Sequence, residues 1–152
     1  MTLETRLEEL GIALPVPPRP LGAYVPAVVT GRLLFLSGML PIKDGRPAMT
    51  GRMGVNLTVE EGRHAARLAA LNGLAVARET LGSLHRIRRA VRLVTHIACT
   101  PDFANHAAVA DGASELLASL FGTDSGHARL AVGAVSLPAL APVELELVFE
   151  ID

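Results

Sequence analysis

The chain has 152 residues, of which 50% are hydrophobic and 19% charged, so it is long and apolar enough for one globular domain and is not a disordered chain. Its formal net charge of -1 gives no basic excess for the phosphates of nucleic acid, so we expect no nucleic-acid partner. Its one cysteine, Cys99, excludes an internal disulfide, and the start of the chain, MTLETRLEELG, lacks the apolar segment of a signal peptide. Because every apolar run is shorter than a bilayer crossing, we expect a cytoplasmic protein without a membrane partner.

The first eighteen residues predict a short helix followed by an extended arm. Residues 2–11 begin with Thr2 as a helix cap, carry three leucines at helical spacing and end at Gly11. Four prolines follow within residues 13–22, which excludes a helix there. We interpret residues 1–18 as the N-terminal helix and arm of a single domain that spans residues 1–152.

The next segment has the pattern of β-hairpins. Two β-rich runs, AYVPAVV and LLFLSG, flank a turn at Thr30-Gly31, and Pro26 places the first run at a sheet edge or a bulge. Asp44-Gly45 predicts a second tight turn.

A long helix and a strand follow this β-rich region. Thr58 and Glu61 form a capping box for a helix that runs to residue 81. Residues 87–99, IRRAVRLVTHIAC, alternate as a strand does, and we expect one face to consist of Val91, Leu93, Thr95 and Ile97.

The remainder predicts a second helix and two strands. The helix has Thr100 or Asp102 as its cap and ends at Gly122. Strands are expected at residues 129–137 and 142–151. This order predicts an α+β fold, a mixed β-sheet with two long helices packed on one face. Because several strands are apolar on both sides, the other face favours a second layer supplied by another subunit.

The last strands contain the strongest candidates for chemistry. Arg129 is the only cation after residue 128, and its planar guanidinium matches a carboxylate. Glu144 is expected to approach the Arg129 end of a neighbouring antiparallel strand, where a carboxylate can position or deprotonate a water molecule. The alternative is that both are ordinary solvated charges on a sheet surface.

Four other residues complete the candidate site. His127, two residues before Arg129, is placed to touch the same ligand, although a solvated loop histidine is the alternative. Ser37 offers a hydroxyl and an amide, Gly38 permits close backbone approach, and Tyr24 needs a partner for its hydroxyl if buried. No pair of histidines has metal-ligand spacing, so we expect no metal.

The same segments resemble the RidA/YjgF family. The resemblance lies in GAYVPAVVTGRLLFLSGMLPI, the capping-box helix, VRLVTHIAC, PDFANH and HARLAVGAVSLPALAPVELELVFEI, in this order over residues 19–152. It implies a chorismate-mutase-like fold, assembly as a homotrimer and ligand clefts between subunits. It further implies hydrolysis of reactive 2-imino or enamine acids to 2-keto acids and ammonia without a cofactor.

The resemblance also implies roles for individual residues. Arg129 would bind the substrate carboxylate, Glu144 would position the attacking water, and backbone groups of Ala131 would contact the imine. The chain departs from the family pattern at Ala131 and Gly133, where members with deaminase activity often have Cys and Glu, and at Ala107, where they have Asn. Two alternatives therefore remain: a non-catalytic module that binds small carboxylates or a protein, and the endoribonuclease activity often associated with the family.

Overall fold

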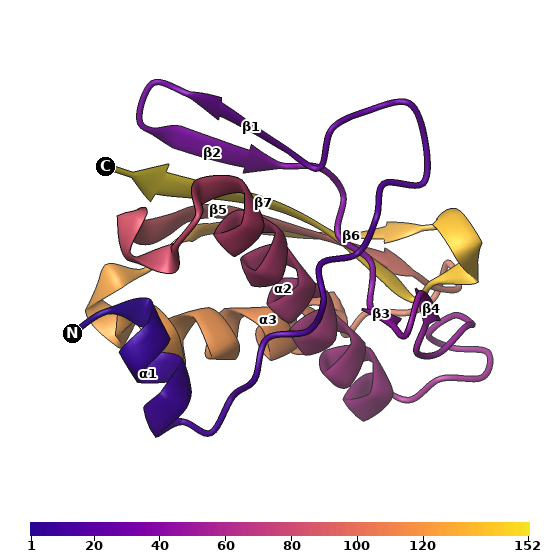
Figure 1. Ribbon diagram of the computed structural model, residues 1–152. Coiled ribbons are helices and arrows are strands. Elements are labelled where there is room, and N and C mark those ends of the chain that lie inside the picture. Colours follow the sequence, from indigo (N-terminus) through magenta and orange to yellow (C-terminus); the bar gives the residue numbers. More distant parts are fainter.

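The computed structural model describes residues 1–152, arranged as a five-stranded sheet, a two-stranded hairpin and three α-helices (Figure 1). None of the helices combines the length and the apolar character that a bilayer crossing requires. The elements in chain order are α1 (Leu3–Glu9), β1 (Ala27–Thr30), β2 (Leu33–Leu36), β3 (Ile42–Lys43), β4 (Arg46–Pro47), α2 (Val59–Leu81), η1 (Leu84–Arg86), β5 (Ile87–Ala98), α3 (His106–Phe121), η2 (Thr123–Ser125), β6 (Ala128–Ala134), η3 (Pro138–Leu140) and β7 (Val143–Ile151).

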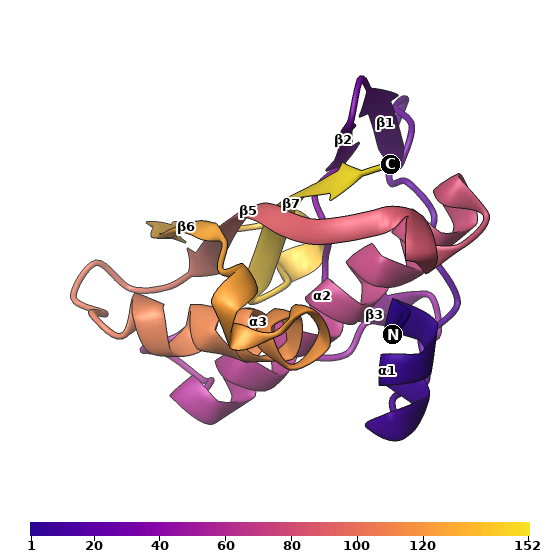
Figure 2. The ribbon, with the colours of Figure 1, turned by 90° about the vertical axis from the view of Figure 1, so that its left-hand side faces the viewer.

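The main sheet has the order β1-β2-β7-β5-β6. Strand β6 runs parallel to β5, and all other neighbours are antiparallel. Figure 2 shows α2 and α3 together beneath this sheet, which leaves its opposite face uncovered. The predicted α+β class, with a mixed sheet and two long helices on one face, is therefore confirmed, as is the edge position of the strand that follows Pro26.

Local sequence signals explain where α2 begins and how it packs. The Thr58 side chain accepts a hydrogen bond from the Glu61 amide at 3.2 Å, and the Glu61 carboxylate accepts one from the Thr58 amide at 2.7 Å. This is the predicted capping box, and it satisfies two amides that the helix itself cannot pair. The helix then buries mainly alanine and glycine. At Gly73 an added Cβ would collide with Leu147 of the sheet, so the small residue permits close helix-on-sheet packing.

The N-terminal helix belongs to the folded core. Thr2 caps α1, as predicted, and Leu3 and Leu7 are buried. The Glu4 carboxylate accepts hydrogen bonds from the Leu84 amide at 2.6 Å and the Ser83 hydroxyl at 2.9 Å, while Arg6 Nε donates to the Ser119 carbonyl at 2.9 Å. In Figure 1 the proline-rich arm then crosses α2 before the chain enters β1. Contacts with η1 and α3 therefore anchor the chain start.

Two boundaries differ from those expected, each for reasons of strand pairing. The second long helix begins at His106, so Thr100 and Asp102 as its cap were wrong predictions. The Thr100 amide instead donates to the Met53 carbonyl at 3.0 Å, which keeps this segment extended. Strand β6 ends at Ala134, not at residue 137, because its partner β5 also ends there.

The expected core face of β5 was wrong at one position. Register shifts near its start place Ala90, which is 3% exposed, on the core side in place of Val91. Leu93, Thr95 and Ile97 are buried on that face as predicted. A bulge of this kind changes which residues face the core without changing the alternating pattern that the sequence displays.

The uncovered face of the sheet carries an apolar band. Val28 and Phe35 lie opposite each other on β1 and β2, and their exposed fractions are 51% and 43%. Leu130 on β6 is 47% exposed. The charges beside this band are largely paired within the chain, since Glu150 contacts both Arg32 and Arg89. A face of this kind suits contact with a second apolar layer.

Candidate functional site

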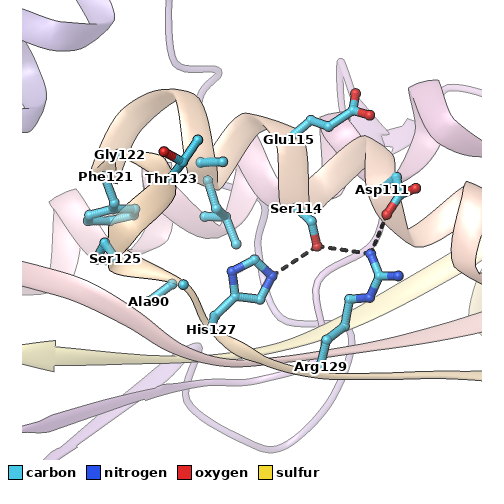
Figure 3. Close-up of a pocket in the computed structure, with 13 residues that line it drawn as sticks. Ala90, Asp111, Ser114, Glu115, Phe121, Gly122, Thr123, Ser125, His127 and Arg129 are labelled. Atoms are coloured by element: carbon cyan, nitrogen blue, oxygen red, sulfur yellow. Dashed lines mark hydrogen bonds and ion pairs between the residues drawn. The ribbon is translucent and has the colours of Figure 1, made fainter.

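Arg129 extends from β6 toward α3, on the helix-covered side of the sheet (Figure 3). Its Nη1 donates to Asp111 Oδ1 at 2.5 Å and to the Ser114 hydroxyl at 3.2 Å. Its Nε and Nη2 have no partner within the chain. Two donors on one edge of the guanidinium therefore remain available to bind a carboxylate side-on.

Close packing between α2 and α3 sets the direction of the helix face that meets Arg129. A Cβ at Gly112 would collide with the Arg63 carbonyl, so this glycine allows the two helices to touch. Arg63 also donates to the Ala108 carbonyl at 3.0 Å and to Glu115 at 2.7 Å. With this side of α3 fixed against α2, Asp111 and Ser114 face β6, three residues apart on one face.

His127 lies beside Arg129 in a pocket of about 470 Å³ between α3, η2 and β6. Its Nε2 lies 2.9 Å from the Ser114 hydroxyl, which already accepts from Arg129. Burial, together with the nearby Arg129 charge, lowers the pKa of His127. A neutral imidazole that accepts the Ser114 proton fits both observations. The predicted proximity of His127 and Arg129 is thus present in the structure.

The other predicted residues line a separate groove of about 1760 Å³, bounded by the proline-rich arm, the β3–β4 hairpin and α2. Tyr24, Ser37, Gly38 and Glu144 all contribute to it. The Glu144 carboxylate lies directly against Gly38, where an added Cβ would collide with it. Gly38 therefore permits the close approach expected from the sequence, although here a side chain of the same chain makes it.

Hydrogen bonds within the chain determine what this groove offers a ligand. The Ser37 hydroxyl donates to the Val25 carbonyl at 2.6 Å, and its amide donates to the Pro26 carbonyl at 2.9 Å. The Tyr24 hydroxyl accepts from the Leu21 amide at 3.2 Å. The Gly38 amide has no such partner, so it is a free donor beside Glu144. The amide and carboxylate thus place a donor and an acceptor side by side.

Glu144 is half-buried, and its surroundings shift the pKa of its carboxyl group. Burial raises its pKa; the opposing effect of His96 is smaller, and Glu146 raises it slightly further. His96 is the register partner of Glu144 on β5, and its Nε2 lies 2.6 Å from Glu146. His96 was not predicted as a site residue. The alternating pattern of β5 places His96 on the face opposite the buried residues, and this can be read from the sequence. Its pairing with Glu144 cannot, because it depends on the order of the strands in the sheet.

Arg129 and Glu144 point away from opposite faces of the sheet. Arg129 pairs with Leu93, whose side chain is buried under the helices, whereas Glu144 pairs with His96 on the uncovered face. Strand β5 also lies between their two strands. The expectation that Glu144 sits on an antiparallel neighbour of the Arg129 strand was therefore wrong. Within one chain the two residues line two separate cavities.

The backbone of Ala131 lies at the free edge of β6. The Cys99 amide donates to the Ala134 carbonyl at 3.1 Å, so Ala134 directs its backbone groups toward β5. Backbone directions alternate along a strand, so the amide and carbonyl of Ala131 point outward. Ala131 thus offers unpaired backbone groups on the strand that carries Arg129.

No three histidine, cysteine or acidic side chains lie together as a metal site would require. Cys99 is buried, and its sulfur lies 3.7 Å from His106 Nε2. A Cβ at Gly133 would crowd both groups. The glycine is explained by this packing, which the sequence did not reveal.

Comparison with known proteins agrees with the fold. Residues 4–150 match the family model described as "YjgF/chorismate_mutase-like, putative endoribonuclease". Protein TCP17 of Trypanosoma cruzi is 42% identical over 147 residues, covering 96% of this chain and 92% of that protein. Atu1372 of Agrobacterium tumefaciens, a solved protein of unknown function, is 42% identical with a TM-score of 0.89, covering 99% of this chain and 92% of its own.

A second solved structure is closer in shape and lower in identity. It is described as a "putative endoribonuclease" of Shewanella oneidensis MR-1, is 33% identical, has a TM-score of 0.94, and covers 99% of this chain and 100% of its own. The fold is a mixed sheet with two long helices on one face, and the family match covers nearly the whole chain. Together they define the class of protein. The chain belongs to the YjgF/chorismate-mutase-like family.

Proposed function

We propose that this protein is a homotrimeric deaminase of small 2-imino acids and their enamine tautomers. The products are the 2-keto acid and ammonia, and the reaction uses neither a metal nor a cofactor. The reaction class is what the resemblance to the RidA/YjgF family implies, and the chain belongs to that family. Two groups that the reaction needs are present: the Arg129 guanidinium on β6, which can bind an anion, and the Glu144 carboxylate on β7.

Arg129 binds the substrate carboxylate in this proposal. Its Nε and Nη2 form a planar pair of donors, which matches the two oxygens of a carboxylate. The Ala131 backbone at the same strand edge contacts the imine end. Anchoring the carboxylate holds the imine carbon in place, and positioning of this kind contributes much of the rate enhancement for an already reactive substrate.

Glu144 activates the water. Its carboxylate accepts a proton as the water oxygen bonds to the imine carbon, and it passes this proton to the imine nitrogen, which gives a carbinolamine. Glu144 then moves the hydroxyl proton of the carbinolamine to its amino group, the C–N bond breaks, and the products are ammonia and the keto acid. The raised pKa of Glu144 suits a group that accepts a proton and then returns it. The free Gly38 amide donates to the substrate, and Tyr24 and Ser37 line the cleft.

Two copies of the chain complete each cleft. Arg129 and Glu144 face away from each other across the sheet, so one small ligand can contact both only if they come from different subunits. The uncovered apolar band and the free edge of β6 supply surfaces for such contacts. A cyclic trimer would then hold three equivalent clefts, each built from unlike surfaces of two neighbours.

The observation that carries the proposal is the half-buried Glu144 carboxylate beside the unpaired Gly38 amide. To test it, an L-amino-acid oxidase would generate imines from several amino acids, with catalase present and semicarbazide as a competing trap. Catalysis by the protein would lower semicarbazone formation and raise keto-acid yield. If no imine among apolar, polar and acidic ones is consumed faster than without protein, the deaminase assignment is wrong.

Two alternatives have separate tests. Ala131 and Gly133 lack side chains that active relatives often carry, which favours a module that binds keto acids without turnover. Binding that requires Arg129 but shows no imine hydrolysis would establish this alternative. The description of the Shewanella relative raises RNA cleavage. Against it, Arg88 and Arg89 of β5 are paired with Asp152 and Glu150, so they add little to a basic surface. Absence of single-stranded RNA binding at low ionic strength would exclude it.

A further inference from the structure

The chain of contacts behind Arg129 suggests a role for α3 that rests on the proposed function. We propose that Asp111 and Ser114 are positioning residues that fix the Arg129 guanidinium so that its Nε–Nη2 edge alone receives the substrate carboxylate. Neither residue touches the substrate in this arrangement. Their effect is to decide which edge of the guanidinium faces the ligand.

The geometry restricts Arg129 to one binding mode. A carboxylate can bind a guanidinium end-on, through Nη1 and Nη2, or side-on, through Nε and Nη2. Asp111 at 2.5 Å and Ser114 at 3.2 Å both occupy Nη1, so the end-on mode is blocked. The side-on edge remains free. Two partners on one nitrogen also limit rotation of a side chain that would otherwise lose much freedom when it binds a ligand.

Ser114 extends this arrangement to His127. The hydroxyl accepts from Arg129 and has one proton of its own, which it can donate to His127 Nε2 at 2.9 Å. This assigns His127 the neutral form with its proton on Nδ1. Figure 3 shows Ser114 between the two side chains, linked to each. The same contact thus holds Arg129 and keeps a second positive charge away from it.

The position of Asp111 supports a role in orientation over one in stability. The side chains of Arg129 and Asp111 are 26% and 42% exposed, and ion pairs with this much solvent contact contribute little to folding. The other carboxylate that lines the pocket, Glu115, is bound by Arg63 and makes no contact with Arg129. It therefore provides a matched control, since it carries the same charge one turn along the same helix.

The experiment measures 2-oxobutanoate affinity by calorimetry for the wild type, Asp111→Ala, Ser114→Ala and Glu115→Gln. We expect Asp111→Ala and Ser114→Ala to weaken binding about ten-fold, as misorientation of an anchoring group does. Glu115→Gln should stay within about two-fold of the wild type, and Ser114→Thr, which keeps the hydroxyl, should restore binding. Thermal unfolding would check that each variant is folded. Unchanged or tighter binding by Asp111→Ala would overturn the proposal, since it would make Asp111 a spectator or a competitor of the ligand.

A second measurement separates this inference from the proposed function. If the wild type binds no 2-keto acid, the function loses its support, and side-chain NMR still tests the arrangement. We expect a resolved Arg129 Nε–H signal and a neutral His127 with its proton on Nδ1. Asp111→Ala should average the first signal, and Ser114→Ala should change the second. An Arg129 signal averaged like that of a free arginine in the wild type would overturn the inference.

Discussion

Arg129 and Glu144 extend from opposite faces of the five-stranded sheet, on strands separated by β5. No rotation of either side chain brings the two charged groups to one small ligand within a chain. The proposed chemistry therefore depends on how two copies meet, and this dependence gives the first prediction.

Mixing two inactive variants should restore activity. Arg129→Ala lacks the anion site, and Glu144→Gln lacks the base, so neither alone should hydrolyse imines. In a randomly mixed cyclic trimer three-quarters of the assemblies contain both chains, and one cleft in three of these is intact. Co-expression should therefore recover about a quarter of wild-type activity. No recovery, in a sample whose mixed assembly is verified by mass spectrometry, would place both groups in a single-chain site.

Removing the guanidinium should strongly weaken binding of the carboxylate. We expect Arg129→Ala to weaken affinity for 2-oxobutanoate about a hundred-fold, as loss of a charge-assisted bidentate contact does. Arg129→Lys keeps the charge without the planar pair of donors and should recover only part of the affinity. Arg92 of β5 has no ion-pair partner and lines neither cavity, so Arg92→Ala is the control. Equal losses in both alanine variants would indicate a general charge effect.

Glu144 should set the acid limb of the pH profile. A general base works only when deprotonated, so turnover should fall as the pH drops through the raised pKa of Glu144. Glu144→Gln should lower turnover by about a hundred-fold or more while affinity for 2-oxobutanoate changes little. A profile unchanged in this variant would contradict the role.

The same raised pKa has an opposite consequence for stability. The folded state binds the Glu144 proton more readily than the unfolded state does. This residue therefore opposes folding fully above its raised pKa, and the effect is lost as the pH falls from that pKa to the ordinary pKa of a glutamate. Glu144→Gln should therefore raise the melting temperature slightly at neutral pH and leave it unchanged in acid. A lower melting temperature at neutral pH would show that burial is not the dominant effect on this group.

Gly38 should tolerate no side chain while Glu144 is present. An added Cβ would collide with the Glu144 carboxylate, so Gly38→Ala should cost about 1–3 kcal/mol of unfolding free energy, as overpacking does. The backbone at Gly38 does not have a positive φ, so conformational strain adds nothing. In the Glu144→Ala background the same substitution should cost much less. Equal costs in both backgrounds, measured by urea denaturation, would mean that the collision is relieved elsewhere.

Signals within a few residues of one another were enough to predict most of the fold. The Thr58–Glu61 capping box and the Asp44-Gly45 turn depend only on local backbone chemistry, and both are present. The start of α3 was mispredicted because the Thr100 amide is used by Met53, which lies far away in the sequence. Local pattern cannot reveal such a competing partner.

The candidate site was predictable as a set of residues and not as an arrangement. Ser37, Gly38 and Glu144 do meet, because β2 and β7 are neighbours. Asp111 was not predicted as the partner of Arg129. It faces Arg129 only because of how α3 is rotated about its axis, and the close contact of Gly112 with the Arg63 backbone fixes that rotation. The separation of Arg129 from Glu144 was not predictable either, because it depends on the strand order, in which β5 lies between their strands.

The docking of α1 gives the chain start an influence on this arrangement. Arg6 holds the carbonyl of Ser119 on the last turns of α3, the helix whose middle presents Asp111 and Ser114 to β6. A helix transmits displacement along its axis. Loss of the hydrogen bond from Arg6 to Ser119 would therefore loosen the contacts of Asp111 and Ser114 with Arg129. A substitution in α1 would then weaken the binding of carboxylate ligands, although the sheet itself would remain intact.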